Sequence, residues 1–544
     1  MEARMNNTGF LHAEGTRFVD KNGRPIVLRG AALGNWLLLE GYMWNFMGKT
    51  CNRERLIEKL FSELAGRDFA EEFLNRYRHA FVSHEDIRRM ARMGFNSVRV
   101  PFNWKHLMCD GPGIKFKAEG FELLDNIVKW CSEEGIYAIL DMHAAPGGQT
   151  GSNIDDGVDD VARLFLEPES WGKALALWEE IARRYKDETY VGGYDLLNEP
   201  IRPFREDAPI KDLDYLIPAL SEFYDECIAR IRNVDPYHML SIEGAHWARD
   251  TRVFDHLYDK NMCIHFHAYW TMPHKKLLEP YIALSEQYQV PLWLGETGEN
   301  TIEWFATLFP MLEENGISWN FWQWKKGIRQ NSNYVIKQPD GWDSVVQYLK
   351  GGPNPGMENV RRMLDEWAEN CRIENCIEIP SVRSAMFRDG DVVIPALSYM
   401  EKGHSHIASQ QREFKDRDGM MYITRFGALP EIDPSHAHGN SDVRTDHPWN
   451  TFDLLLREGE FASYAYQIKA DSTIEFTIEA RGIADGNELC VECSGERQTL
   501  AIGKSQTDYN ATPVIFSGLC GESFKVNCVK GRVAIMGIRC KVVR

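Results

Sequence analysis

Apolar residues recur along the first two thirds of the chain in short runs, each followed by a longer stretch with helical periodicity. The runs are rich in β-branched and aromatic residues, which favours strands. We count eight of them before about residue 370: residues 26–30, 97–101, 137–141, 194–197, 239–243, 262–267, 291–295 and 317–322. Each run is short enough to form one buried strand of a parallel sheet.

The stretch "SHEDIRRMARMG" is typical of the segments between these runs. Ser83 can cap a helix, Ile87, Met90 and Met93 fall on one helical face, and Gly94 follows as a stop signal. This pattern predicts an amphipathic helix between two strands.

Eight alternations of strand and helix over about 350 residues predict an α/β fold, a closed parallel (β/α)8 TIM barrel. An open doubly wound sheet is the alternative. That fold is expected to carry a glycine-rich phosphate loop after its first strand, and "LRGAALGNW" does not match this fingerprint. We therefore favour the barrel.

The pattern changes after Cys376. Segments such as "ASYAYQIKA", "TIEFTIEA", "SFKVNCV" and "RVAIMGIR" alternate with a period of two, which predicts an antiparallel β-sandwich of the jelly-roll kind. Before this change, an amphipathic helix over 357–370 is expected to close the barrel. The predicted domains are a catalytic barrel over 1–375 and a smaller β-sandwich over 385–544.

Charge and composition limit the choice of partners. The 544 residues include 62 basic and 80 acidic ones, a formal charge of -18, which argues against a nucleic acid or an anionic membrane as partner. The N-terminus has no signal-like apolar core and no run approaches the length of a membrane span, so we expect a cytoplasmic protein. An oligomer remains possible.

The cysteines and several histidines give little support for a metal or cofactor. Twelve cysteines scattered through a long chain indicate reduced thiols. Cys490 and Cys493 lie in a predicted strand, where residues three apart point to opposite faces. The couplets His404/His406 and His436/His438 lie in polar, loop-like sequence without a carboxylate cluster. We expect buried thiols, surface histidines, no metal site and no cofactor.

Polar and aromatic residues gather where the predicted strands end. In a barrel these ends form one rim, and groups buried there each need a partner. One such residue has an even chance of being structural, but their convergence indicates a site. The strand ends carry Arg99, His143, Asn198, Glu199, Glu243, His267, Tyr269, Glu296 and Trp322.

Two of these residues, Glu199 and Glu296, form a pair of carboxyl groups on opposite sides of the rim. Such a pair can cleave a glycosidic bond when one is a protonated acid and the other an ionised nucleophile. Arg99 is expected to favour ionised Glu296, and a less compensated site to raise the pKa of Glu199. The heptapeptide "YDLLNEP" alone is also compatible with a helix cap.

The first 350 or so residues resemble glycoside hydrolase family 5, the retaining barrel enzymes. The resemblance rests on motifs that occur in order at the strand ends: "GFNSVRVPFNW", "LDMHAAPGG", "LLNEP", "HFHAYW", "LGET" and "NFWQWKK". It implies that Glu199 is the acid/base and Glu296 the nucleophile. It further implies a shell around the sugar made of Arg99, His143, Asn198, His267, Tyr269 and Trp322, with Trp324 as an alternative to Trp322.

Two segments resemble the branch of exo-β-1,3-glucanases and β-glucosidases. "LRGAALGNWLLLEGYMW" implies that Glu40 holds the hydroxyls of a terminal glucose, and "HAAPGGQTGSNIDDG" implies the same for Asp156 or Asp155. A pocket closed in this way favours removal of single sugars. The sequences "FVSHEDI" and "IEGAHWARD" depart from the branch on the side of the leaving group.

The resemblance therefore implies a retaining hydrolase that releases β-linked glucose from small carbohydrate substrates. A disaccharide-releasing diglycosidase, an endo-β-glucanase and a non-catalytic sugar-binding protein are the alternatives. The C-terminal part resembles carbohydrate-binding modules by pattern, and a purely structural sandwich explains that pattern equally well.

Overall fold

The computed structural model describes residues 9–46, 48, 50–269, 271, 273, 275–327, 330–401, 403–407, 422–424, 452–470 and 472–543. Two compact units divide these residues, and each is described by itself. Among the described residues, no helix combines the length and the apolar character that crossing a membrane requires.

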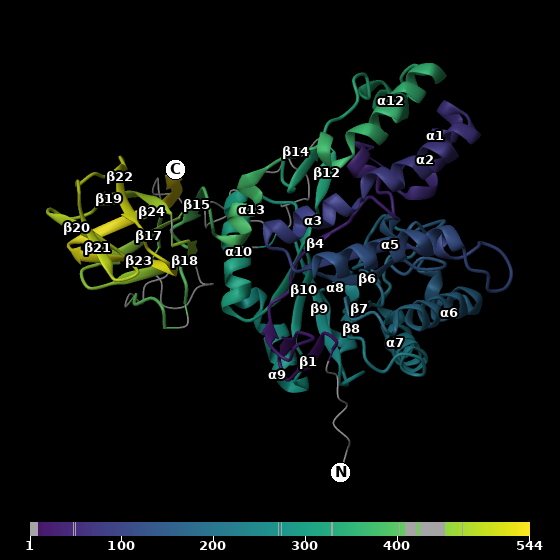
Figure 1. Cartoon of the computed structure of the whole chain (residues 1–544), viewed down its shortest axis with the longest axis horizontal. Helices are drawn as coiled ribbons and strands as arrows, with labels where there is room; N and C mark the ends of the chain where they lie inside the picture. The colour runs from purple at the N-terminus through teal and green to yellow at the C-terminus, as the bar shows by residue number, and fades with distance from the viewer. Residues whose placement is uncertain are drawn as a thin grey trace, which may run out of the picture. The chain divides into compact units, whose positions relative to one another are not determined.

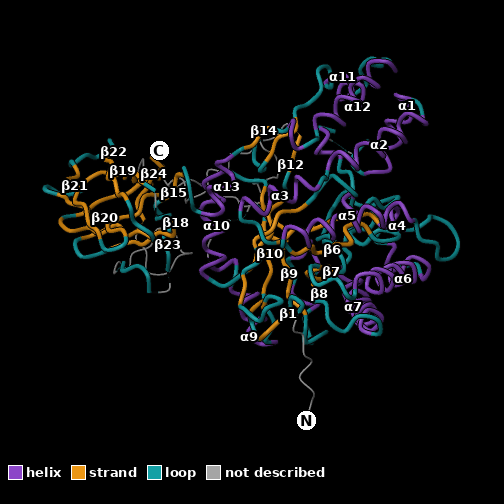
Figure 2. Tube along the Cα trace, in the orientation of Figure 1, coloured by secondary structure: helices purple, strands orange, loops and turns teal. Residues whose placement is uncertain are grey.

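The first unit is built on the predicted barrel. Its strands pair in chain order, and the last strand returns to the first to close the sheet. The registered neighbours are parallel. Figure 2 shows these strands together in orange. The barrel strands are β4 (Arg29–Ala32), β5 (Ser97–Asn103), β6 (Tyr137–Ala144), β7 (Val191–Asp195), β8 (Leu240–Glu243), β9 (Met262–Ala268), β10 (Leu292–Gly298) and β11 (Ser318–Trp322).

All eight predicted strands are confirmed, but the bounds of the first were wrong. Pro25–Ile26 forms β3, which pairs with β2 (Arg17–Val19), and β2 pairs with β1 (His12–Glu14) in a separate antiparallel sheet. Leu11, Phe18 and Leu28 pack with barrel residues such as Trp293 in one buried cluster. The N-terminal sheet therefore covers an apolar end of the barrel, which explains why residue 26 had the pattern of a barrel strand.

Helices occupy the segments between the strands, as predicted. Figure 1 shows α5, α6 and α7 around the barrel strands. The helices are α1 (Glu54–Ala65), α2 (Arg67–Phe81), α3 (His84–Met93), α4 (Trp104–Leu107), α5 (Ala118–Glu134), α6 (Pro168–Tyr185), α7 (Ile217–Arg232), α8 (Ala245–Ala248), α9 (Glu279–Tyr288), α10 (Ile302–Glu314), α11 (Asp343–Leu349), α12 (Met357–Asn370) and α13 (Pro380–Phe387).

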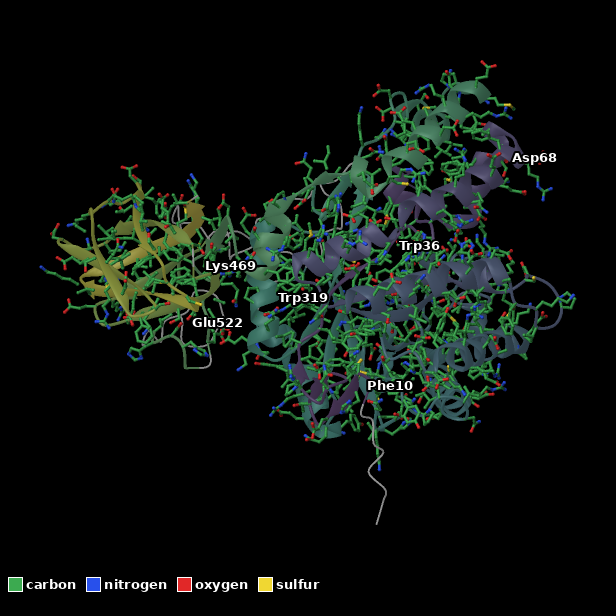
Figure 3. All side chains as sticks on the ribbon, viewed as in Figure 1. Phe10, Trp36, Asp68, Trp319, Lys469 and Glu522 are labelled. Carbon is green, nitrogen blue, oxygen red and sulfur yellow. The ribbon has the colours of Figure 1, made fainter. Side chains whose placement is uncertain are left out.

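Helix α12 has the bounds that its periodicity predicts, and it packs against α1 and α2. The three lie side by side in Figure 1. Trp44, Trp342 and Trp367 meet between them, with ring centroids 5.1–6.1 Å apart. Closure of the barrel itself comes from the pairing of β11 with β4. Figure 3 contrasts exposed Asp68 on α2 with Trp319, which is buried on β11.

The second unit contains the C-terminal sheets, α10, α13 and the segment Tyr269–Glu279. One sheet has the order β16-β17-β24-β19-β22 with β15 on β24, and the other β18-β23-β20-β21. Phe476 contacts Tyr466 and Phe524 of the second sheet. The strands are β15 (Val392–Pro395), β16 (Tyr422–Thr424), β17 (Phe452–Arg457), β18 (Phe461–Ile468), β19 (Thr473–Gly482), β20 (Asn487–Cys493), β21 (Glu496–Ile502), β22 (Asn510–Ser517), β23 (Gly521–Lys530) and β24 (Arg532–Val543).

Two short pairs complete the strands of the first unit: β12 (Lys325–Gly327) is parallel to β13 (Tyr334–Ile336), which is antiparallel to β14 (Ile377–Glu378). Lys325 is fully buried and pairs with Asp86 of α3 at 2.8 Å. The same carboxylate accepts hydrogen bonds from the Ser83 backbone and hydroxyl and from the Trp324 indole. Asp86 thus caps α3 and joins it to the segment after β11.

We predict that Asp86→Ala lowers the free energy of unfolding by about 3–5 kcal/mol, because it leaves the Lys325 ammonium buried without its anion. Urea denaturation of the whole chain checks this. The double variant Asp86→Leu/Lys325→Met removes both charges and is expected to recover most of the loss. A loss below about 1 kcal/mol in the single variant contradicts a structural role for the pair.

Candidate active site

Arg99 on β5 is the centre of the polar cluster inside the barrel. Its side chain is fully buried. Nε donates to Asp195 Oδ2 at 2.9 Å, Nη1 to Glu296 Oε2 at 2.5 Å, and Nη2 to Asn198 Oδ1 at 2.8 Å. Nη2 also lies 3.1 Å from Asp141 and 3.2 Å from Glu243. One guanidinium on β5 therefore binds residues of β6, β7, β8 and β10 and the Asn198 side chain after β7.

The charges around Arg99 determine its protonation. Burial disfavours the guanidinium, but four neighbouring carboxylates raise the pKa of Arg99 well above its ordinary value. Burial also raises the pKa of Asp195, yet His265 and Arg99 outweigh it and hold that pKa at about 2. The positive charge of Arg99 thus offsets the desolvation penalty of the neighbouring carboxylates and keeps Asp195 ionised.

The two predicted catalytic carboxyl groups meet in this cluster. Glu296 lies within β10 and Glu199 follows β7. One carboxylate oxygen of each, together with a ring nitrogen of His267, lie within 4.8 Å of one another. Both side chains are largely buried, with exposed fractions of 14% for Glu199 and 7% for Glu296. A sugar carbon and its glycosidic oxygen can therefore reach both groups at once.

Glu199 is held from its backbone and from its side chain. Its φ of 45° is left-handed, a conformation that a glutamate rarely adopts. Its backbone N–H donates to Glu243 Oε2 at 2.6 Å, and its Oε1 lies 2.8 Å from His267 Nδ1. These two contacts hold the carboxyl group toward Glu296.

The expected rise in the pKa of Glu199 is wrong for the free protein. Burial does raise the pKa, but the hydrogen bond and positive charge of His267 outweigh it, so the pKa lies below its ordinary value. The sequence argument counted the desolvation of Glu199 and omitted this cation. The proton that the mechanism needs lies beside Glu199 on His267.

His267 on β9 is the second cation of the site. Burial lowers its pKa, but the charges of Glu243 and Glu296 raise it well above the ordinary histidine value. Its Nε2 lies 3.0 Å from His265 Nε2. Burial lowers the pKa of His265 to about 3, so this second ring is neutral. The His267 ring therefore donates to the His265 ring, and both rings belong to β9.

His143 and Trp322 form one wall of the site, as predicted. His143 Nδ1 lies 2.7 Å from Asp141, and its Nε2 accepts from Asn198 Nδ2 at 3.2 Å. The Trp322 ring stacks on His143 with centroids 5.5 Å apart, and its indole donates to Tyr42. Trp324 instead bonds Asp86 in the core. Trp322 is therefore the tryptophan beside the catalytic groups.

Gln149 was not among the predicted site residues. Its side-chain amide donates to the backbone carbonyls of His143 and Asn198, each at 2.8 Å, and accepts from Ala145 N–H. It thus joins the loops that follow β6 and β7. "PGGQTG" gave no signal beyond its glycines, because the partners of Gln149 are backbone groups that only the fold brings together.

Glu40 and Asp156, the residues expected to hold the far end of a sugar, are both buried. Glu40 precedes the short helix Gly41–Trp44 and bonds Asn35 through its backbone. Asp156 accepts from Arg55 N–H, from Asn103 and, as an ion pair, from Lys105. Asp155 bonds Thr150 and the Gly157 N–H. Asp156, but not Asp155, lines a cavity.

That cavity measures about 300 Å³ and belongs to the barrel unit. Trp104, Ser170 and Lys173 line it opposite Asp156, and Lys173 lies over the Trp104 ring at 5.7 Å. A ring face together with charged and hydroxyl groups can bind a polar cyclic molecule. Further tryptophans near the strand ends differ from Trp104: Trp36 and Trp44 are core residues, Trp247 is half-buried, and Trp270 lies outside the described residues.

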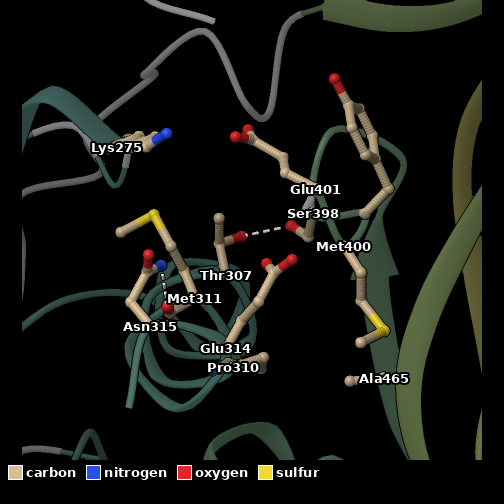
Figure 4. Close-up of a pocket in the computed structure, with 11 residues that line it drawn as sticks. Lys275, Thr307, Pro310, Met311, Glu314, Asn315, Ser398, Met400, Glu401 and Ala465 are labelled. Carbon is tan, nitrogen blue, oxygen red and sulfur yellow. Dashed lines mark hydrogen bonds between the residues drawn. The ribbon is translucent and has the colours of Figure 1, made fainter. Parts of the chain in front are cut away.

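The second unit contains a smaller cavity of about 120 Å³, shown in Figure 4. Thr307 of α10 and Ser398 share a hydrogen bond at its base, and Lys275 and Glu401 lie at its edge. Tyr269 is half-buried in the same unit. The cavity contains none of the groups of the catalytic cluster, and we assign it no function.

The cysteine and histidine predictions of the second unit are largely confirmed. Cys490 and Cys493 are buried on β20, and every cysteine is free. Cys520 is exposed, which corrects the expectation of uniformly buried thiols. His404 and His406 are exposed, whereas His436 and His438 lie outside the described residues.

In the barrel, Glu199, Glu243, His265, His267 and Glu296 are close enough to resemble metal ligands. However, the Arg99 guanidinium lies 3.2 Å from Glu243 and 2.5 Å from Glu296, and it repels a divalent cation. We therefore treat these residues as a hydrogen-bonded cluster.

Comparison with known families agrees with this geometry. Residues 65–327, which include β5 to β11 and both catalytic candidates, match the family model "Cellulase (glycosyl hydrolase family 5)". Over these residues the barrel is similar to the catalytic domains of glycosyl hydrolase family 5. The confirmed resemblance covers the motifs at Arg99, Asn198, Glu199, His267 and Glu296.

Curated relatives of the family 5 barrel include a beta-xylosidase of Phanerodontia chrysosporium, 32% identical over 51% of this chain and 56% of the relative. A glucan 1,3-beta-glucosidase of Lachancea kluyveri is 29% identical over 42% and 51%. The chain thus spans about half the length of these relatives. A solved endogalactoceramidase aligns over 97% of this chain and 99% of its own, at 15% identity and a TM-score of 0.47.

We predict that Arg99→Met destabilises the chain more at pH 8 than at pH 5. Without the cation, the buried carboxylates have a higher pKa in the folded than in the unfolded chain. The folded chain then binds more protons, so its stability falls as the pH rises between these values. Thermal unfolding at both pH values checks this.

Arg184→Met is the matched control, because Arg184 pairs with Asp125 on the surface. It is expected to change stability by less than about 1 kcal/mol at either pH. An Arg99→Met variant with the same loss at pH 5 and pH 8 contradicts the neutralising role of Arg99.

Proposed function

We propose that this protein is a retaining glycoside hydrolase that removes β-linked glucose from the non-reducing end of small glucosides or oligosaccharides. The observation that carries the proposal is the spacing of Glu199 and Glu296, whose nearest oxygens lie within 4.8 Å. Retaining enzymes place their carboxyl groups about 5–5.5 Å apart, whereas inverting enzymes need roughly 6.5–9.5 Å for an intervening water.

In the first step, Glu296 attacks the anomeric carbon and the glycosidic bond breaks. Arg99 bonds Glu296 Oε2, which favours the ionised form of the nucleophile. The leaving oxygen takes a proton from Glu199. That proton reaches Glu199 Oε1 from His267 Nδ1 along their 2.8 Å hydrogen bond, which leaves His267 neutral.

In the second step, water attacks the glycosyl–Glu296 ester from the side of Glu199. Glu199 takes a proton from this water and shares it again with His267, which restores the starting state. Glucose leaves with the β configuration that it had in the substrate, because two displacements at one carbon restore its stereochemistry. Trp322 on His143 supplies an apolar wall against the sugar ring.

Release of glucose from the chain end rests on the loops after β4 and β6. Glu40 and Asp156 are buried acids on these loops, at positions that resemble the exo-acting branch of the family. The names of the curated relatives, a glucan 1,3-beta-glucosidase and a beta-xylosidase, support removal of single sugars. Carbohydrate is thus the proposed partner, and the cytoplasmic location stays a prediction.

A disaccharide-releasing activity is the second candidate. The cavity of about 300 Å³ beside Asp156 favours it, because this cavity offers space for a further sugar beyond the terminal one. The name of the matched family model, Cellulase, also keeps endo-cleavage of a β-glucan open. Product analysis on an aryl glucoside, an aryl diglycoside and a β-glucan distinguishes these activities. Glucose as the sole first product supports the main proposal.

We predict that Glu199→Ala and Glu296→Ala each lower kcat on an aryl β-glucoside with a poor leaving group by about 10³-fold or more. On an aryl β-glucoside with an activated leaving group, azide is expected to restore turnover in both variants, with opposite products. It replaces water after Glu199→Ala and gives the β-azide, and it replaces the nucleophile after Glu296→Ala and gives the α-azide.

Glu180→Gln, a change at a half-buried helical glutamate paired with Arg183, is the control and should keep full activity. Substantial activity in either alanine variant without azide, or the same azide anomer from both, rejects the assigned roles. Hydrolysis rates and proton NMR of the products give both results.

A further inference from the structure

Glu243, at the end of β8, contacts both parts of the acid/base apparatus and has no role in the steps above. Its side chain is fully buried. Oε2 accepts the Glu199 backbone N–H at 2.6 Å. Oε1 lies 3.5 Å from His267 Nε2, 3.2 Å from His265 Nδ1 and 3.2 Å from Arg99 Nη2. Tyr224 fixes the end of the strand through the Glu243 carbonyl.

We propose that Glu243 is a positioning residue for the reaction: its carboxyl group holds the backbone of Glu199 and, through its charge, determines which atom of the Glu199–His267 pair carries the proton. This inference rests on the proposed function. The two carboxyl oxygens of Glu243 have different contacts: Oε2 accepts the Glu199 backbone N–H, and Oε1 faces the His267 ring.

The backbone contact has a structural reason. Glu199 has a left-handed φ of 45°, and Ile201 has a φ of 55°, so the turn after β7 is strained. The Glu243 oxygen that accepts the Glu199 N–H stabilises this turn and compensates part of the strain. Without it, the turn is free to relax, and the carboxyl group moves away from Glu296.

The charge of Glu243 acts on the proton. An ionised Glu243 attracts the proton to His267 and keeps Glu199 ionised, whereas a neutral Glu243 weakens the imidazolium and lets the proton move to Glu199. Burial, aided by Asp195, raises the pKa of Glu243 to about 8. The charge of Glu243 therefore changes close to the pH range in which the Glu199–His267 pair transfers its proton.

The surroundings of Glu243 are charged on every side. Arg99, His265, His267 and Tyr224 contact Glu243, and Asp195 acts on it through its charge. The other titratable groups of the cluster are bound to Arg99, Asp141 or His267: Asp141, His143, Glu199 and Glu296. Glu243 itself contacts both the Glu199 backbone and the His267 ring.

The test compares two variants that separate contact from charge. Glu243→Gln keeps an oxygen for the Glu199 N–H and removes the charge. The Glu199–His267 pair then loses the Glu243 anion, which helps it to keep its proton at high pH. The basic limb of the pH profile of kcat/KM should therefore move down by about one pH unit. Glu243→Asp keeps the charge but is one methylene shorter. Its basic limb should stay within about 0.3 units while kcat falls about tenfold.

The leaving group distinguishes positioning of the acid from general damage. A dinitrophenyl β-glucoside needs no proton from the acid, whereas a methyl β-glucoside does. Both variants should lose about tenfold or more in kcat/KM on the methyl glucoside and less than about twofold in kcat/KM on the dinitrophenyl glucoside. Tyr224→Phe, which disturbs the same strand end without touching charge, is the control and should leave the basic limb in place.

Equal losses on both leaving groups, or a Glu243→Gln profile that superimposes on the wild type after scaling, overturn the inference. Either variant alone decides it if the other does not fold, which thermal unfolding reveals. A wild-type chain without activity on both glucosides overturns the proposed function, and the role of Glu243 with it. An active wild type with unshifted variants overturns only the role of Glu243.

Discussion

A single buried cation allows four barrel strands to bring carboxylates into one buried site. Four carboxylates lie around Arg99, and without the guanidinium each would have to be protonated or exposed. Because Arg99 binds Asn198, Glu243 and Glu296 at once, it also sets the distance between the strands that carry the catalytic pair. Charge balance and site geometry are thus one constraint in this barrel, and the proposed nucleophile Glu296 is one of the charged groups that Arg99 neutralises.

Most of the fold could be predicted from the sequence, because burial leaves a local signal. Barrel strands are buried on both faces and appear as apolar runs, and α12 has the bounds of its periodicity. The first strand was misplaced because β3 and β4 share one apolar run, and only the pairing partners separate them. Grouping of α10 with the second unit depends on contacts far along the chain, which periodicity does not reveal.

The residues of the candidate site that stand at strand ends were predicted from the sequence. Arg99, His143, Asn198, Glu199, His267, Glu296 and Trp322 come together in one unit. Asp141, Asp195 and His265 were missed because they lie inside apolar runs, where one polar residue resembles a satisfied core group. The predicted rise in the pKa of Glu199 was wrong for a related reason. This pKa depends on His267 and Glu243, whose distances to Glu199 are set only by closure of the barrel.

The central claim is that Glu296 becomes covalently bonded to the sugar while Glu199 remains the acid. The most direct test is to trap the intermediate with a 2-deoxy-2-fluoro-β-glucoside that has an activated leaving group, and to map the modified residue by mass spectrometry of peptides. The account predicts one fluoroglucosyl group per chain, on Glu296, with turnover resuming as the label is released. A label on any other residue, or the inverted α-glucose as the first product of an ordinary glucoside, would contradict it.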